Sequence, residues 1–175
     1  MMRRVVVTGL GTISPIGTTL EETWNALING VSGIKKISSP GAPAGTAGQI
    51  KDFSPRAFNI PVKSLKVMNK TIQYALAASS RAVQHAGIAD TDYDARRTGL
   101  ALGVNGIQYT AEELFLASYE AIGRDMRNYM DEEHRLDGGP ITLRGPGLAV
   151  HPLWPLSVLA NMSLCHIAIQ HNVQG

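Results

Sequence analysis

The sequence predicts an α/β fold in which helices pack on a sheet, and three observations carry this prediction. Residues 5–7 form a β-branched run, too short for a helix and followed by glycines, which is typical of a buried strand. A helical pattern covers residues 61–87, and a second apolar run covers residues 98–104. Because a helix separates the two strands, we expect them to lie parallel in one sheet.

A first helix is predicted over residues 19–29. Thr18 or Thr19 would cap its first turn, with Glu21 and Glu22 as capping-box partners. Residues with helical spacing form one apolar face, which we expect to pack on the sheet: Leu20, Trp24, Leu27 and Ile28.

The rest of the chain is predicted in less detail. Residues 31–61 read as a surface loop with a weak strand near 48–51. The helix over 61–87 has small residues on every side, which permit close backbone approach: Ala75, Ala77, Ala78, Ser79, Ser80 and Ala82. A last helix, over residues 155–171, is predicted to be buried on more than one side.

Length and composition favour one globular domain over residues 1–175, with a loop insertion at 127–155 that is rich in charge, glycine and proline. The net charge of +2 is too small to favour nucleic-acid binding. The N-terminal apolar run is too short for a signal peptide or a membrane span, so we expect a cytoplasmic protein. A single cysteine, Cys165, excludes an internal disulfide framework.

A dinucleotide-binding site is an alternative interpretation of the glycine turn. Gly9 and Gly11 follow a strand, as a pyrophosphate-binding turn requires. Ser14 stands where the third glycine belongs, and Pro15 precedes any helix that could present free N–H groups. The match to this motif is therefore weak.

Three segments together resemble a known family. They are residues 3–17 (RRVVVTGLGTISPIG), 22–27 (ETWNAL) and 30–34 (GVSGI). This opening is similar to that of a β-ketoacyl-acyl carrier protein synthase. The resemblance implies a partial thiolase-like fold with a mixed sheet packed by helices, an incomplete domain, and a role in fatty acid or polyketide synthesis.

The resemblance also implies what this chain lacks. A condensing enzyme of this family uses a thiolate nucleophile and two histidines, because acyl transfer and decarboxylation both develop negative charge that must be stabilised. The chain ends before the positions that match these residues, so no catalytic residue is assigned. Cys165 falls within the preceding helix and is expected to be a structural thiol. The five histidines lack metal-ligand spacing, and no metal or cofactor is expected.

Two binding sites follow from the resemblance. Lys63 and Lys66, at the start of the long helix, would receive an acidic acyl carrier protein. Residues after the second strand would line an acyl pocket, with Ile107 nearest to the family's apolar gate: Gly103, Asn105, Gly106 and Ile107.

Three functions remain open from the sequence. The chain is expected to be a ketosynthase portion or subunit, inactive as an isolated chain and condensing acyl and malonyl thioesters only if another chain supplies the catalytic residues. It could instead be a non-catalytic partner, similar to a chain length factor, that binds a carrier protein. A nucleotide-binding oxidoreductase is the weakest alternative. The resemblance implies acyl carrier protein as a partner. A second copy or a complementary ketosynthase chain is also expected, because two strands cannot cover the predicted helices.

Overall fold

A computed structural model describes residues 4–37, 45–89, 91–105, 114–115, 118 and 153–174. These residues belong to two compact units, one formed by Met1–Gly103 with Asn161–Gly175 and the other by Val104–Ala160. The predicted single domain over 1–175 stays a prediction. Residues 127–152 of the predicted insertion lie outside the described residues.

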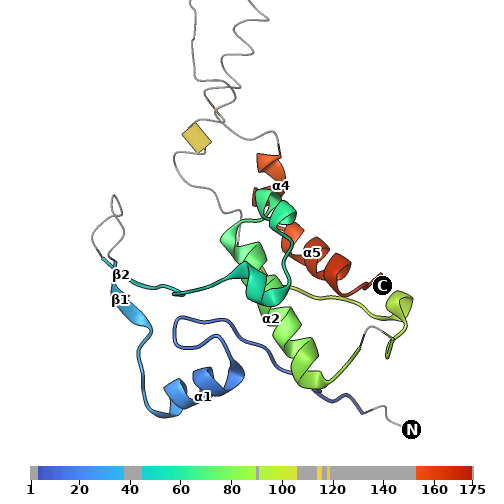
Figure 1. The fold of residues 1–175 in the computed structure, drawn as a ribbon, viewed down its shortest axis with the longest axis horizontal. Coiled ribbons are helices and arrows are strands. Elements are labelled where there is room, and N and C mark those ends of the chain that lie inside the picture. Colours follow the sequence, from blue (N-terminus) through green and yellow to red (C-terminus); the bar gives the residue numbers. More distant parts are fainter. Residues whose placement is uncertain are drawn as a thin grey trace, which may run out of the picture. The chain divides into compact units, whose positions relative to one another are not determined.

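The first unit contains most of the described elements, shown in Figure 1. In chain order these are α1 (Leu20–Ile28), β1 (Ile34–Lys36), β2 (Thr46–Gly48), the 3₁₀ helices η1 (Pro55–Phe58) and η2 (Val62–Val67), α2 (Lys70–Ala86), the 3₁₀ helix η3 (Ala95–Arg97) and α5 (Met162–Gln170). The second unit contains α4 (Trp154–Val158). β1 and β2 pair in antiparallel register, with Lys35 opposite Ala47.

Helix α2 is the centre of the core. Asn69 caps its start, because the Asn69 side chain accepts a hydrogen bond from the Ile72 N–H at 3.0 Å. It ends as the sequence predicts at Gly87, whose φ of 66° suits glycine. The buried cluster joins α2 to the chain before it and to α5: Ile60, Met68, Ile72, Leu76 and Ile167.

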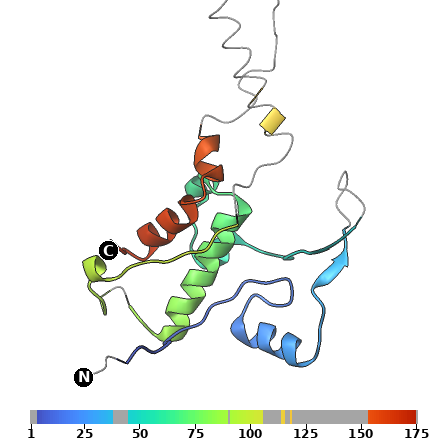
Figure 2. The same cartoon turned by 180° about the vertical axis from the view of Figure 1, so that it is seen from behind.

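Helix α5 lies beside α2 in both views of the ribbon (Figures 1 and 2). Beyond the apolar contact, Gln170 Nε2 donates a hydrogen bond to Ser80 Oγ at 2.5 Å. Ser79 Oγ and His171 Nε2 lie 3.3 Å apart. These polar contacts fix the end of α5 along the middle of α2, and they join residues about 90 positions apart in the chain.

The N-terminal segment crosses α2 at its small residues. A Cβ atom at Gly11 would lie 2.1 Å from the Ala78 carbonyl oxygen, and one at Gly9 would lie 2.2 Å from the Ala82 carbonyl oxygen. Neither distance leaves room for a side chain, so only glycine permits this approach. The predicted close backbone approach to α2 is confirmed, and the partner is the turn after residues 5–7.

The first helix begins as predicted but does not pack as predicted. Thr19 caps α1 and forms a reciprocal capping box with Glu22. The apolar face, however, is open in the described part of the chain: Trp24, Leu27 and Ile28 are each about 60% exposed. The expectation that this face packs on the sheet is wrong here, because the only sheet among the described residues is the β1–β2 pair.

Neither predicted parallel strand forms. Val5, Val6 and Val7 are 95, 69 and 81% exposed, and residues 98–104 carry no strand assignment. An extended apolar segment becomes a strand only where a second segment pairs with its backbone, and no described residues pair with either run. The weak strand predicted near 48–51 is observed slightly earlier, as β2.

Two predicted helices also need correction. The long pattern from residue 61 divides into η2 and α2, because Met68 has extended backbone angles between them. The last pattern, over 155–171, divides into α4 and α5, since Leu159 is extended as well. In both cases the apolar residues keep their helical spacing across the break between the two helices, so periodicity alone does not reveal the break.

The glycine contact with α2 gives a first test. Gly11→Ala should destabilise the protein by about 1–3 kcal/mol, because the added methyl group collides with the Ala78 carbonyl and the backbone must move. Thermal and urea unfolding measure the loss. Gly45→Ala is the control, since a Cβ there meets only Ile37 Cδ1 at 3.8 Å and should change stability little. Equal stabilities of the two variants would contradict the contact.

The α1 cap gives a second test. Glu22 Oε2 accepts hydrogen bonds from Thr18 N at 2.8 Å and Thr19 N at 3.2 Å. The bonds from Thr18, backbone first and then hydroxyl, hold the pKa of Glu22 below its ordinary value of 4.5. A lowered carboxyl pKa means that the cap is fully present above that value and is lost as pH falls through the folded-state pKa.

NMR temperature coefficients of the Thr18 and Thr19 amides, followed from about pH 7 to about pH 2, should report this loss at the acid end. Glu22→Gln should remove the transition. Glu21→Gln removes the same charge from the same turn and should preserve it. Loss of the transition in the Glu21 variant would argue against the capping role of Glu22.

Candidate functional site

The predicted carrier-protein residues Lys63 and Lys66 lie on η2, one element earlier than the start of α2. Both side chains are exposed. In a 3₁₀ helix, side chains three residues apart eclipse one another, so these two ammonium groups share one side of η2. The structure therefore presents them as a pair, while their role in binding stays a prediction.

The opposite side of η2 is fixed to the core. Ile60 and Met68, which flank the element, are 2 and 7% exposed, and Leu65 packs against the same cluster. The Ser64 N–H donates to the Pro61 carbonyl at 2.9 Å at the start of the turn. The lysine pair thus stands on a rigid base and not on a free loop.

An aromatic group supports the segment that leads into η2. The Phe53 ring stacks on Phe58, with centroids 5.5 Å apart, and meets Tyr74 of α2 edge-on at 4.8 Å. Two cations lie over these rings: Lys70 Nζ is 5.9 Å from the Phe53 centroid, and Arg81 Cζ is 5.3 Å from the Phe58 centroid. These contacts hold residues 53–58 against α2.

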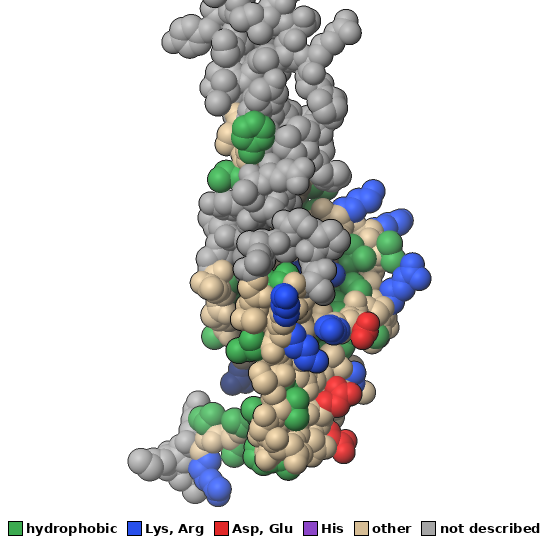
Figure 3. Space-filling view, turned by 90° about the vertical axis from the view of Figure 1, so that its left-hand side faces the viewer, with side chains coloured by type: hydrophobic (Ala, Val, Ile, Leu, Met, Phe, Trp, Pro, Cys, Tyr) green, Lys and Arg blue, Asp and Glu red, His purple; other side chains and the backbone are tan. Residues whose placement is uncertain are grey.

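Charge is distributed unevenly, which the overall charge of +2 hides. All six lysines fall between residues 35 and 70, and residues 31–89 contain eight Lys and Arg against one acidic residue, Asp52. Every lysine is exposed. Figure 3 shows Lys and Arg side chains gathered on one face, with few acidic side chains among them. A charge count by segment would have found this face from the sequence.

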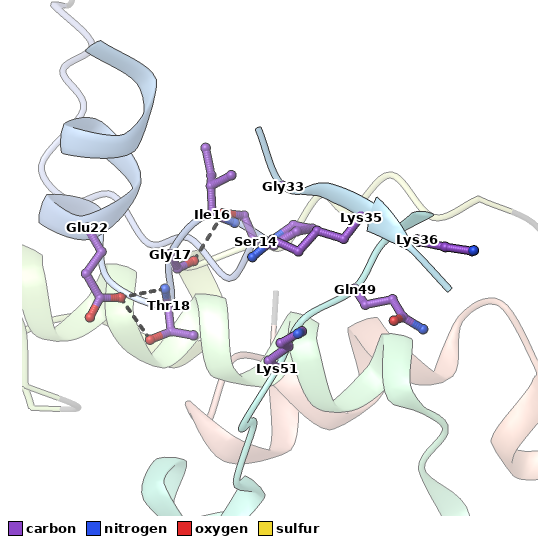
Figure 4. A pocket seen from close by; sticks show the side chains of 11 residues that line it. Ser14, Ile16, Gly17, Thr18, Glu22, Gly33, Lys35, Lys36, Gln49 and Lys51 are labelled. Atoms are coloured by element: carbon purple, nitrogen blue, oxygen red, sulfur yellow. Dashed lines mark hydrogen bonds between the residues drawn. The ribbon is translucent and has the colours of Figure 1, made fainter. Parts of the chain in front are cut away.

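Sequence reasoning also missed a pocket on this unit, drawn in Figure 4. It has a volume of about 240 Å³ and lies between the turn at residues 14–18, strand β1 and the residues that follow β2. Its charged lining consists of Lys35, Lys36, Lys51 and Glu22. No short motif marks this pocket, because it depends on the pairing of β1 with β2.

The predicted acyl-pocket residues are described only in part. Gly103 and Asn105 are exposed, and they belong to different compact units. Gly106 and Ile107 lie outside the described residues. The acyl pocket stays a prediction.

Cys165 and the described histidines form no reactive cluster that could hold a metal ion. Cys165 is a free, half-buried thiol on α5. Burial lowers the pKa of the neighbouring His166, and its Nε2 has no hydrogen-bond partner among the described residues. His85 Nδ1 accepts from the Leu10 N–H at 3.1 Å, which is a structural role. Within the described ranges no three His, Cys, Asp or Glu residues are grouped to hold a metal ion.

None of the described helices is both long and apolar enough to cross a membrane.

Solved structures resemble the chain over almost its whole length. The ishigamide ketosynthase/chain length factor matches with a TM-score of 0.66 and 27% identity, covering 98% of this chain and 38% of that one. A β-ketoacyl synthase from Burkholderia phymatum matches with a TM-score of 0.65 at 21% identity, which bears on the fold alone. These likenesses confirm the predicted partial thiolase-like α/β fold.

Sequence comparisons agree with the structural ones. 3-Oxoacyl-[acyl-carrier-protein] synthase 2 of Vibrio harveyi is 40% identical over 104 residues, which are 58% of this chain and 25% of that protein. The Vibrio cholerae protein of the same name is 29% identical over 178 residues, covering 99% of this chain and 37% of that protein. The chain thus spans well under half of these relatives. The family model for the β-ketoacyl synthase N-terminal domain matches residues 2–145, and the chain belongs to this family.

Proposed function

We propose that this chain is the N-terminal part of a ketosynthase of fatty acid or polyketide synthesis, acting in the cytoplasm with acyl carrier protein. In this proposal it contributes scaffold and docking surface to a decarboxylative Claisen condensation of acyl and malonyl thioesters. The catalytic cysteine and histidines come from a further segment or chain. Membership of the β-ketoacyl synthase family carries the proposal.

Exposed apolar surface supports the need for a complementary part. Large apolar side chains stay open to solvent on the N-terminal segment, on α1 and on the residues after it: Val5, Val6, Val7, Trp24, Leu27, Ile28, Val31 and Ile34, each more than half exposed. Burying such a surface is favourable by about 25 cal/mol for each Å² removed from water. Extensive exposed apolar surface marks an interaction site.

The chemistry of the described residues supports a scaffold role. A ketosynthase nucleophile needs a stabilised thiolate within reach of a base. Cys165 lies within α5, half-buried, and within the described ranges it belongs to no group of three or more His, Cys, Asp or Glu residues. Its position on a packed helix suits a structural thiol.

A non-catalytic partner, comparable to a chain length factor, is the second candidate. One observation favours it: a solved structure with 27% identity is described as a ketosynthase together with a chain length factor. The dinucleotide alternative gains no support, because Gly9 and Gly11 press against α2 and leave no space there for a pyrophosphate.

Native mass spectrometry with a coexpressed ketosynthase portion that carries the nucleophilic cysteine tests the first proposal. We expect a stoichiometric complex in which amide exchange at residues 5–7 slows by at least about tenfold, because these exposed valines gain backbone partners. The complex should condense acyl and malonyl thioesters, and replacing the partner's nucleophilic cysteine with alanine should abolish this activity.

A stable complex that lacks condensing activity would favour the non-catalytic partner. A homodimer that forms in preference to a complex with the complementary portion would contradict the shared enzyme, because a second copy would then cover the exposed apolar surface.

The docking surface has its own test. Lys63→Glu with Lys66→Glu should weaken binding of acyl carrier protein by about tenfold or more, because two exposed cations on one side of η2 become anions facing an acidic partner. Calorimetry at low and high salt measures the affinity. The control, Arg96→Glu with Arg97→Glu on η3, makes the same charge change elsewhere and should alter affinity less. Equal effects of the two double variants would refute a specific lysine pair.

A further inference from the structure

We propose that the pocket between the turn at residues 14–18, β1 and the chain after β2 binds a doubly charged oxyanion, phosphate or a phosphate monoester, between Lys35 and Lys51. This site is separate from the lysine pair on η2 and does not depend on the carrier-protein proposal.

The two lysines reach the pocket from different segments. Lys35 lies on β1, and Lys51 follows β2 by three residues. Figure 4 shows the Lys35 side chain extending along the turn at Ser14 and Gly17, whereas Lys36 extends away from it, and Lys51 lines the same pocket from the segment after β2. The antiparallel pairing places Lys35 opposite Ala47, four residues before Lys51, and both lysines line the pocket.

Neither ammonium group forms an ion pair with a described residue. Like charges that converge on one pocket repel each other, and this repulsion is reduced by water and salt but is not removed. A dianion bound between them would offset this repulsion and would accept one charge-assisted hydrogen bond from each ammonium group. Lysine binds phosphate well as a compact point charge with rotatable donors.

The one acidic group that lines the pocket does not neutralise these lysines. Glu22 directs its Oε2 atom to Thr18 and Thr19, accepting from both backbone N–H groups and from the Thr18 hydroxyl at 3.1 Å. Its charge is therefore engaged at the start of α1, where the helix dipole favours an anion. Figure 4 shows the Glu22 carboxylate turned toward Thr18.

The neighbouring polar groups define the kind of ligand. Ser14 Oγ donates to the Gly17 carbonyl at 3.1 Å and accepts from the Ile16 N–H at 3.3 Å, so it is already occupied. The binding energy must come from the two ammonium groups. A small, strongly charged oxyanion exploits them best, and the pocket, at about 240 Å³, has room for one with its water. The concave form favours a compact group over the broad face of an acidic protein.

Isothermal calorimetry and ¹⁵N chemical-shift mapping of the whole chain with inorganic phosphate test the site, at constant ionic strength maintained with chloride. We expect a dissociation constant of about 1 mM or tighter, with shifts at residues 14–18, 35 and 51. Lys35→Gln with Lys51→Gln should weaken binding at least about tenfold. Lys63→Gln with Lys66→Gln removes the same charge elsewhere and should change phosphate affinity by less than about twofold.

A parallel titration with a phosphoserine peptide distinguishes inorganic phosphate from a phosphorylated protein as the source of the phosphate group. Binding of a phosphoserine peptide with the same lysine dependence, alongside or in place of inorganic phosphate, would support the site and assign a phosphorylated protein as a source. Equal weakening in both double variants would overturn the proposal, since it would indicate only general charge attraction. Binding of polyglutamate without binding of either phosphate probe would also overturn it, in favour of an acidic protein partner.

Discussion

Gly9 and Gly11 press so closely against α2 that a methyl group at either position would overlap a backbone carbonyl oxygen. This contact directs the N-terminal segment across the helix around which the core is built. Ile72 and Leu76 of α2 pack with Ile167 of α5 in one buried cluster. Helix α2 therefore makes two kinds of contact. Large apolar residues in its first half pack in the buried cluster, and small residues in its second half allow the N-terminal backbone to lie against it.

The sequence predicted the features that depend on a few neighbouring residues. The Thr19–Glu22 capping box and the glycine end of α2 are local, so their chemistry can be read directly. Strand pairing is different, because it needs a partner from elsewhere in the chain. Residues 5–7 have the composition of a buried strand but no described residues pair with them, and the charged β1 pairs with β2 although neither has a strong strand pattern.

The candidate site shows the same difference between local features and features that depend on distant parts of the chain. Lys63 and Lys66 came from a family resemblance that covers the local sequence; both are exposed on one side of η2, and their role in docking stays a prediction. Lys35 and Lys51 were missed because sixteen positions separate them and they line one pocket only in the folded chain, where β1 pairs with β2. The regional charge was nevertheless present in the sequence, concealed by an overall charge near zero.

The restriction of every lysine to residues 35–70 has a practical consequence for any study that uses amine chemistry. Apart from the α-amino group, an amine-reactive ester can modify this protein only within those thirty-six positions, on β1, η2, the segment after β2 and the first residue of α2. Immobilising the chain on a biosensor surface through its amines would hold it by its basic face. Partners in solution could then not reach the basic face, while the exposed apolar side chains of α1 would stay accessible.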